Sequence, residues 1–366
     1  MALDRKRAVN VNVEEEGMKA AVLYGKKDLR ITEVKKPSLG SREILIACKS
    51  AGLCGSDLHL YRGTWEIETP RIIGHEATGI IAEAGRNVDG WKCGDRVVIE
   101  PVITCGECYW CRESEINNYF CENYYENVIG FFSLDGTFAD YVKVPQSNIY
   151  RLPDSLSFDE SALIEPLSCA LRGIYNINIE SGDSVGIIGL GTLGLLFAQL
   201  ARVSGAAKII GIEVTECKLN KARELGVDVT INPEKEDSIA VVKDHTEGRG
   251  LDVVIEAVGA ISTYEQALQL ARRGGRVCLF GIAPQGTMNI DAMEAYRKEL
   301  LIKWVFGSPR GTFKRSIELL ANGRVIASPL ITHKFPLEEI LEAMTIMDQG
   351  KEEFIKIMIH PNPSEQ

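Results

Sequence analysis

The chain has 366 residues, of which 45% are hydrophobic and 25% charged, and its formal net charge is −10. A chain of this length is longer than the chains that usually form a single hydrophobic core, so we expect two domains. The acidic balance argues against nucleic acid and anionic membranes as partners, because both require a basic protein face.

Residues 1–17 carry mixed charge and no apolar run. A secretory signal needs an apolar run of about 7–15 residues, and a mitochondrial transit peptide is poor in acids, unlike Glu14–Glu16 here. We therefore expect a flexible extension, a fold that starts near Met18, and a cytoplasmic location. Residues 184–201 are uncharged, but their three glycines favour a strand, a turn and a helix over a membrane span.

Residues 18 to about 160 contain many short apolar segments separated by Gly and Pro. Such segments lie at 19–24, 43–52, 79–85, 95–100 and 138–144. The spacing predicts an irregular, mostly antiparallel β domain.

From residue 182 the pattern changes to apolar runs that alternate with helix-length amphipathic segments. The runs lie at 184–188, 207–212, 227–231, 251–258, 274–280 and 300–306. This alternation predicts an α/β domain with a doubly wound parallel sheet covered on both faces. A helix is expected at 312–323, and the apolar segment 354–361 is expected to return to the first domain.

Gly189-x-Gly191-x-x-Gly194 lies between an apolar strand and a helix. The glycines permit a tight turn, a close approach to a pyrophosphate and close helix packing. Glu213 follows the next strand, where an acid accepts hydrogen bonds from ribose hydroxyls and repels a 2′-phosphate, so NAD is favoured over NADP. Lys218 weakens this preference because it could meet a phosphate. The predicted cofactor-binding residues are Gly189, Gly191, Thr192, Leu193, Gly194, Glu213 and Lys218; the alternative is a glycine-rich turn that binds nothing.

Four cysteines cluster within a short stretch, at Cys105, Cys108, Cys111 and Cys121. Three thiolates at this spacing and a fourth nearby can close a tetrahedral structural zinc site. A zinc ribbon that binds nucleic acid is a competing interpretation, which the acidic residues around the ligands disfavour. An iron–sulfur cluster also fits four thiolates.

Cys54 and the pair His75-Glu76 lie upstream of this cluster. Cys, His and carboxylate side chains are zinc ligands, and three of them with a water form an open, catalytic site. Adjacent residues in a regular strand point to opposite faces, so His75 and Glu76 can share a metal only if the backbone turns, as Gly74 permits. In a regular strand Glu76 would instead lie behind the ligands.

These features together resemble the zinc-dependent medium-chain dehydrogenases, from Met18 to the C-terminus. Gly74-His75-Glu76-x-x-Gly79-x5-Gly85-x-x-Val88 fits the zinc signature of that family. The resemblance implies a GroES-like catalytic domain at 18–165 and 308–366, with a structural-zinc lobe at about 100–125, and an NAD-binding Rossmann domain at 166–307. Relatives commonly have seven residues before the last cysteine of the lobe, whereas this chain has nine.

The resemblance also assigns roles to single residues. Cys54 and His75 look like catalytic zinc ligands, and the third ligand is Glu76 or Glu165, with water between the metal and the other carboxylate. Ser56 and His59 match a proton relay, and Asp57 matches the residue that holds a ligand imidazole. Plain alternatives are a surface histidine and a turn-capping aspartate. Arg310 falls where polyol dehydrogenases carry an arginine beside the zinc-bound water, but Gly311 replaces the tyrosine that usually follows; the alternative is a surface arginine.

The chain is most similar to the sorbitol (polyol) and threonine dehydrogenase branches. The similarity implies an NAD-linked oxidation of a secondary alcohol, a polyol or sugar alcohol, to the ketone by hydride transfer, with one catalytic and one structural Zn²⁺ per subunit. Alternatives are an L-threonine 3-dehydrogenase, an aldose dehydrogenase and a non-catalytic protein that binds NAD and zinc. A homotetramer or a dimer is implied, with a small-molecule substrate and neither nucleic acid nor membrane as partner.

Overall fold

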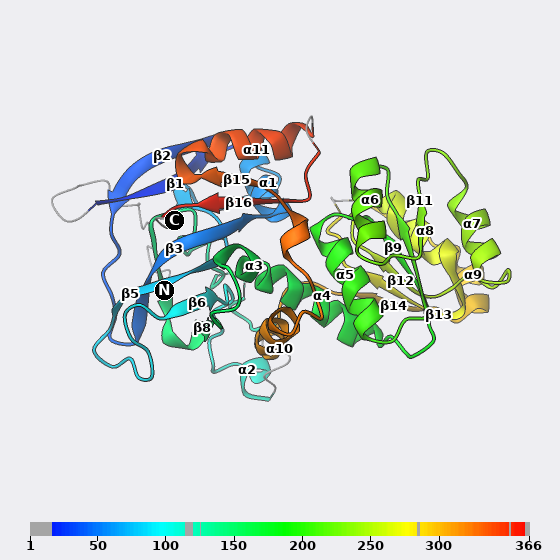
Figure 1. The fold of residues 1–366 in the computed structure, drawn as a ribbon, viewed down its shortest axis with the longest axis horizontal. Helices are drawn as coiled ribbons and strands as arrows, with labels where there is room; N and C mark the ends of the chain where they lie inside the picture. Colours follow the sequence, from blue (N-terminus) through cyan, green and yellow to red (C-terminus); the bar gives the residue numbers. More distant parts are fainter. Residues whose placement is uncertain (1–16, 114–119, 125, 284–285, 351–352, 363–366) are drawn as a thin grey trace, which may run out of the picture. The chain divides into compact units, whose positions relative to one another are not determined.

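The computed structural model describes residues 17–113, 120–124, 126–283, 286–350 and 353–362. The predicted extension at 1–17 therefore lies outside the described residues except for Gly17. The chain divides into two compact units (Figure 1). The first comprises the chain up to Glu165, Pro309–Ile317 and the chain from Ile331 onward, and the second comprises Pro166–Ser308 and Glu318–Leu330.

The first unit is built mainly from antiparallel strands. These are β1 (Gly17–Gly25), β2 (Asp28–Lys35), β3 (Glu43–Leu53), β4 (Arg71–Ile72), β5 (Glu76–Ala84), β6 (Arg96–Ile99), β7 (Tyr141–Pro145), β8 (Ile149–Arg151), β15 (Ile331–Pro336) and β16 (Lys356–His360). Within the described residues, one sheet has the order β2-β1-β4 and the other the order β15-β16-β3-β5-β6-β8, with β7 also paired to β3. Among the described strands of this unit, β15 and β16 are the one pair that runs in parallel. The predicted irregular, mostly antiparallel β domain is confirmed.

Short helices connect and cover these strands. They are α1 (Gly55–Arg62), α2 (Tyr109–Glu113), α3 (Phe158–Ala162) and α11 (Ile340–Gln349). α4 (Ile164–Ile177) and α10 (Arg310–Ala321) carry the chain from one unit into the other.

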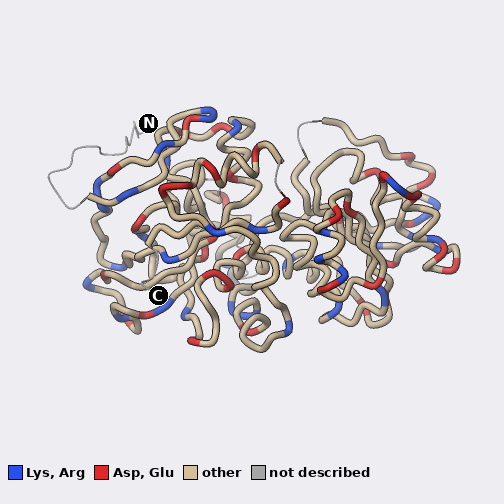
Figure 2. The backbone as a smooth tube through the Cα atoms, turned by 45° about the horizontal axis from the view of Figure 1, so that its top comes forward, with Lys and Arg blue, Asp and Glu red and all other residues tan. Residues whose placement is uncertain are grey.

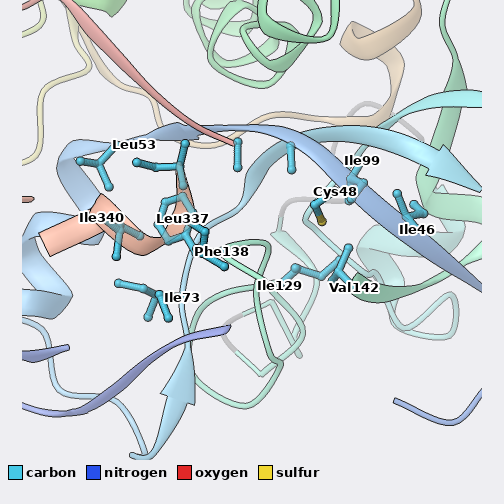
Figure 3. Close-up of a cluster of buried hydrophobic side chains, with 14 of the residues drawn as sticks. Ile46, Cys48, Leu53, Ile73, Ile99, Ile129, Phe138, Val142, Leu337 and Ile340 are labelled. Carbon is cyan, nitrogen blue, oxygen red and sulfur yellow. The ribbon is translucent and has the colours of Figure 1, made fainter. Parts of the chain in front are cut away.

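A buried hydrophobic cluster joins the C-terminal segment to the early strands of the first unit. Figure 3 shows Leu337 and Ile340 beside Leu53 and Ile73, with Phe138 among them. Each fully buried side chain of this size contributes roughly 1.5–3 kcal/mol to folding. This packing, with the antiparallel pairing of β16 and β3, brings β16 next to the end of β3, where α1 begins.

The second unit contains a six-stranded sheet within the described residues, and its strands are parallel. They are β9 (Ser184–Ile188), β10 (Lys208–Ile212), β11 (Val229–Ile231), β12 (Leu251–Glu256), β13 (Ala271–Leu279) and β14 (Leu301–Trp304). Their order is β11-β10-β9-β12-β13-β14, which confirms the doubly wound sheet. The crossover helices are α5 (Thr192–Val203), α6 (Glu216–Glu224), α7 (Ser238–His245), α8 (Ile261–Leu270) and α9 (Ala292–Lys298).

The segment after α10 differs from the sequence-based expectation. The resemblance predicts that residues 308–366 belong to the first domain, whereas Glu318–Leu330 belongs to the second unit. The buried Gln199 side chain explains the difference, because it donates to the Ile326 carbonyl at 3.1 Å and accepts from the Ile326 N–H at 2.7 Å. Such pairing to the backbone is invisible in a hydrophobic pattern.

Charged residues of both signs are interspersed along the backbone of both units (Figure 2). Among the described residues, no helix is both long and apolar enough to cross a membrane.

Candidate active site

The start of α1 and the loop before β5 bring together three candidate metal ligands. The sulfur of Cys54, a ring nitrogen of His75 and a carboxylate oxygen of Glu76 all lie within 4.8 Å of one another. Cys54 is the N-cap residue of α1, and His75 directly precedes β5, whose first residue is Glu76. A thiolate, an imidazole and a carboxylate form a donor set that zinc binds.

Gly74 allows the two adjacent ligands to point the same way. Its φ is +97°, a value that favours glycine, and an added Cβ would lie 2.8 Å from the Phe138 ring. His75 therefore sits outside the regular strand, and the alternation that would separate it from Glu76 does not apply.

Asp57 orients the imidazole of His75. Its Oδ1 lies 3.4 Å from Nδ1 of His75, and its Oδ2 accepts the Cys54 N–H at 2.9 Å. Nε2 of His75 lies 3.5 Å from the Ser56 hydroxyl oxygen. Because Nδ1 faces the buried carboxylate, Nε2 is the nitrogen available to a metal.

The electrostatics of this group suit a cation. Burial opposes a charge on His75, yet Asp57 and Cys54 raise its pKa well above the ordinary value. Burial likewise opposes a charge on Lys356, yet Glu76 and Cys54 raise its pKa. Since a buried positive charge is stabilised from several sides here, the residues fit a divalent metal in charge as well as in donor chemistry.

Lys356 is a residue of this site that sequence reasoning missed. Its ammonium group pairs with the Glu76 carboxylate and donates to the Leu53 carbonyl at 3.0 Å, and only 3% of its side chain is exposed. The available signal was one lysine inside the apolar segment 354–361. Its partner lies 280 residues away in sequence, so only the pairing of β16 with β3 reveals the contact.

Two other predicted residues stand apart from this group. Glu165 is buried near the start of α4, and it is not among the residues whose ligand atoms lie within 4.8 Å of one another. Arg310 is the first residue of α10, and its side chain lies outside the described part of the structure.

The predicted relay residues Ser56 and His59 both lie on α1. Nδ1 of His59 lies 2.9 Å from the Thr64 hydroxyl oxygen, and the ring stacks on Trp65 with centroids 4.8 Å apart. Burial, followed by the nearby Arg62 charge, lowers the pKa of His59. His59 is therefore neutral at about pH 7 and can accept a proton.

The four lobe cysteines also form a compact group. Their sulfurs all lie within 4.8 Å of one another; the residues are Cys105, Cys108, Cys111 and Cys121. Backbone N–H groups of Glu107 and Cys108 point at the Cys105 sulfur, each at 3.4 Å, and they lower its pKa. The backbone N–H of Glu122 lowers the pKa of Cys108 to about 6. Burial raises the pKa of Cys111 to about 12 and also raises that of Cys121, so the pKa shifts favour a thiolate at only two of the four positions. The group fits a tetrahedral zinc ion because its four sulfurs meet at one place.

In the second unit the glycine loop follows β9. Gly189 has a φ of +88°, Gly191 is the N-cap residue of α5, and a Cβ at Gly194 would overlap the Gly189 carbonyl oxygen. Thr192, Leu193 and Gly194 form the first turn of α5. The N-terminus of a helix that follows such a loop is suited to binding a phosphate.

Glu213 follows β10 and faces the same loop. Its Oε2 accepts the Leu190 N–H at 3.0 Å, and its Oε1 accepts the Val214 N–H at 2.8 Å. Lys218 lies half-buried in α6. The structure therefore brings Glu213 to the glycine loop, where an adenosine ribose would lie in a fold of this type.

Comparisons with known proteins agree with this geometry. Residues 40–154 match the family described as alcohol dehydrogenase GroES-like domain, and residues 192–322 match the family described as zinc-binding dehydrogenase. The chain is 34% identical to a sorbitol dehydrogenase of Bacillus subtilis over 95% of this chain and 98% of that protein. It is 36% identical to an L-threonine 3-dehydrogenase of Pyrococcus abyssi over 91% of this chain and 95% of that protein.

A solved structure of a zinc-binding dehydrogenase from Sinorhizobium meliloti, bound to NADP, superimposes with a TM-score of 0.87. It is 32% identical and covers 95% of this chain and 100% of its own. The shared fold, the two cysteine-containing ligand groups and the glycine loop lead to one conclusion. The chain belongs to the zinc-dependent medium-chain alcohol dehydrogenases, which are oxidoreductases.

Proposed function

We propose that this enzyme oxidises a secondary alcohol, a polyol or sugar alcohol, reversibly to the ketone with NAD. The observation that carries the proposal is the group of the partly buried Cys54 with the buried His75 and Glu76, on a chain whose second unit has the glycine loop and Glu213. The similarity to a sorbitol dehydrogenase along almost the whole chain supports the polyol class.

The residues that would hold the catalytic zinc are Cys54, His75 and either Glu76 or Glu165. We favour Glu76, since its carboxylate is already beside the other two ligands. When bound, zinc supplies Lewis acidity toward the substrate oxygen, and the nicotinamide supplies the hydride acceptor. Arg310 is proposed to contact the polyol substrate. The lobe cysteines would hold the structural zinc.

The proton of the substrate hydroxyl is proposed to leave through α1. Ser56 Oγ, which lies beside the His75 ring, receives it first. His59 is three residues further along the same helix, so both side chains lie on one face. Because its pKa is lowered, His59 is neutral and can take the proton at its Nε2, while Nδ1 stays with Thr64.

The cofactor is proposed to be NAD rather than NADP. Its binding residues would be Gly189, Gly191, Thr192, Leu193, Gly194, Glu213 and Lys218. The carboxylate of Glu213 is fixed by backbone N–H groups, so it would repel a 2′-phosphate. Because the Sinorhizobium meliloti relative was solved with NADP, both cofactors belong in the assay. We expect Glu213→Ala to reduce the preference for NAD by raising its KM more than that of NADP.

L-threonine is the second candidate substrate. Two observations favour it: the similarity to an L-threonine 3-dehydrogenase, and Gly311 in place of the tyrosine expected for a full set of polyol contacts. The same ligand group and the same proton path would serve either substrate.

We also propose a homodimer or homotetramer in the cytoplasm. β14 ends the order of the described strands, and the exposed fractions of Leu301 and Trp304 are 54% and 58%. An exposed apolar edge strand readily pairs with another chain. Sedimentation of Trp304→Lys against the unchanged protein tests this, with a shift toward monomer expected. Five of the ten cysteines are proposed zinc ligands, which must stay reduced to bind the metal, and this suits a reducing compartment.

The deciding experiment measures NADH formation with sorbitol, xylitol, galactitol, 2,3-butanediol, L-threonine and glucose, before and after chelation. We expect turnover of polyols that chelation abolishes and zinc restores. Turnover of L-threonine or glucose alone would contradict the substrate class and keep the reaction. Binding of NADH without turnover of any substrate, in zinc-loaded protein, would favour a non-catalytic protein.

A further inference from the structure

Glu256 is a buried carboxylate that the proposed mechanism does not use. It is the last residue of β12 and is fully buried. Its Oε1 accepts the N–H groups of Val258 and Gly259, each at 2.9 Å, and lies 2.7 Å from the Thr263 hydroxyl oxygen. Its Oε2 is buried without a hydrogen-bond partner among the described residues. Burial raises the pKa of this carboxyl, so keeping an acid here costs folding free energy.

The contacts of Glu256 fix the loop that follows β12, residues 257–260. Two N–H groups of this loop bind Oε1, and the Thr263 hydroxyl, which also binds Oε1, accepts the Ala260 N–H at 3.2 Å. The loop is therefore held at both ends by a single side chain and its hydroxyl partner.

The same residue and its neighbour Tyr264 hold the segment that follows β13, residues 280–283. The Glu256 carbonyl oxygen accepts the Phe280 N–H at 2.9 Å and the Gly281 N–H at 3.0 Å. The Tyr264 hydroxyl donates to the Gly281 carbonyl and accepts the Ala283 N–H at 3.3 Å.

These two loops and the glycine loop pack without spare room. A Cβ at Gly189 would lie 2.6 Å from a methyl carbon of Val258, and a Cβ at Gly259 would lie 2.5 Å from the Ile282 carbonyl oxygen. A shift of residues 257–260 would therefore displace one or both of the neighbouring loops.

The position of Glu256 in the sheet indicates what these loops serve. In the order β11-β10-β9-β12-β13-β14 the strand order reverses between β9 and β12, and Glu256 pairs with Ile188 across that boundary. A dinucleotide binds outside the carboxyl ends of the strands at such a reversal, with one half on each side. Glu213 and the glycine loop mark the adenosine side, so the loops after β12 and β13 lie on the nicotinamide side.

We propose that Glu256 is a positioning residue for the nicotinamide half of the cofactor, because its carboxylate sets the conformation of the loop after β12, which packs against the segment after β13. The proposal rests on the dinucleotide site of the proposed function. It predicts that loss of the carboxylate weakens ligands that contain nicotinamide and spares ligands that contain only the adenosine half.

The test compares NADH and ADP binding to zinc-loaded Glu256→Ala and Glu256→Gln. For the alanine variant we expect the Kd of NADH to rise about tenfold or more, and the Kd of ADP to stay within about twofold of wild type. The glutamine variant keeps an acceptor in place of Oε1, so its Kd for NADH should stay within about threefold. Thr263→Val removes one partner of Oε1 and gives a milder change in the same direction if the alanine variant does not fold.

Asp252→Asn is the matched control. Asp252 lies on the same strand at its opposite end, where it accepts the Ser184 N–H at 2.8 Å and pairs with Arg272. This variant should lower Tm and leave both affinities unchanged. The proposal is overturned if folded Glu256→Ala and Thr263→Val bind NADH as wild type does, or if NADH and ADP weaken equally. If the wild-type protein binds neither ligand, the proposed dinucleotide site itself is wrong.

Discussion

The ion pair between Lys356 and Glu76 should make the stability of the folded protein depend on whether zinc is bound. Both groups are buried, so removal of one leaves an uncompensated charge that costs about 3–5 kcal/mol. A bound zinc ion would give Glu76 a second cationic partner. We therefore expect Lys356→Met to destabilise chelated protein by about 3 kcal/mol and zinc-loaded protein by clearly less.

Calorimetry of both forms checks this prediction. Lys334→Met is the matched control, because its partner Asp159 is also an acid of the first unit but the Lys334 side chain is 57% exposed. That variant should cost under about 1 kcal/mol with or without zinc. If Lys356→Met lost the same free energy of unfolding in the chelated and zinc-loaded forms, zinc would not interact with Glu76 as we propose.

His59 determines the acid limb of the proposed reaction. Since burial and then Arg62 lower the pKa of His59 below the ordinary value of about 6.5, the ring is half-protonated only at a pH below that value. We expect kcat/KM to fall below this pH in wild type, and His59→Asn to lower activity about 100-fold and remove that limb. An unchanged pH–rate profile of the variant would exclude His59 from the proton path.

At the scale of elements, Asp159 of α3 joins three strands of the first unit. It accepts from the Ser50 hydroxyl of β3 at 2.6 Å and from His360 of β16 at 2.8 Å, and it pairs with Lys334 of β15 at 2.6 Å. Burial opposes its charge, but the hydrogen bonds from His360, Lys334 and Ser50 lower its pKa below the ordinary range. This carboxylate therefore stabilises the C-terminal segment that carries Lys356.

The pH dependence of that stabilisation has a definite sign. A carboxyl whose pKa is lowered by folding stabilises the protein fully above its unfolded pKa, about 3.9, and the stabilisation is lost as pH falls below it. We expect Asp159→Asn to be less stable than wild type by about 1–2 kcal/mol at neutral pH, and the difference to shrink below about pH 4. Urea unfolding of both proteins across this range measures it. If the difference in free energy of unfolding between Asp159→Asn and wild type persisted below about pH 4, the destabilisation would come from changed packing and not from the lost charge.

For the whole molecule, two ligand groups predict two zinc ions with different effects. Four thiolates would close a site whose metal contributes to folding, whereas three ligands at the Cys54 group would leave a fourth position on the metal for the substrate. We expect about two zinc ions per wild-type chain and one in either single variant. Cys108→Ser should lower Tm strongly, and Cys54→Ser should abolish activity with Tm close to wild type.

Elemental analysis measures the zinc content of wild type, Cys108→Ser and Cys54→Ser, and calorimetry measures their Tm. A Cys108→Ser protein with unchanged Tm would contradict the structural role of the lobe. Full zinc content in Cys54→Ser would contradict its role as a ligand.

The sequence by itself determined the features that depend on local pattern. Alternating apolar runs predicted the parallel strands β9–β14, because each strand and each crossover helix has its own hydrophobic pattern and is bounded by turn residues in the sequence. The spacing of Cys105, Cys108 and Cys111 predicted a ligand cluster, since residues this close along the chain must meet. Gly74 before His75 marked the turn that lets both adjacent ligands face one metal.

Only the tertiary structure decided the contacts between distant segments. Lys356 reaches Glu76 because β16 pairs with β3, and Glu318–Leu330 joins the second unit because Gln199 binds the backbone at Ile326. Glu256 lies inside an apolar run of the sequence, and only the fold shows that its carboxylate binds the N–H groups of Val258 and Gly259 in the loop after β12. A buried polar group is stabilised by whichever partner the fold brings to it, and neither hydrophobic period nor spacing along the chain encodes that partner.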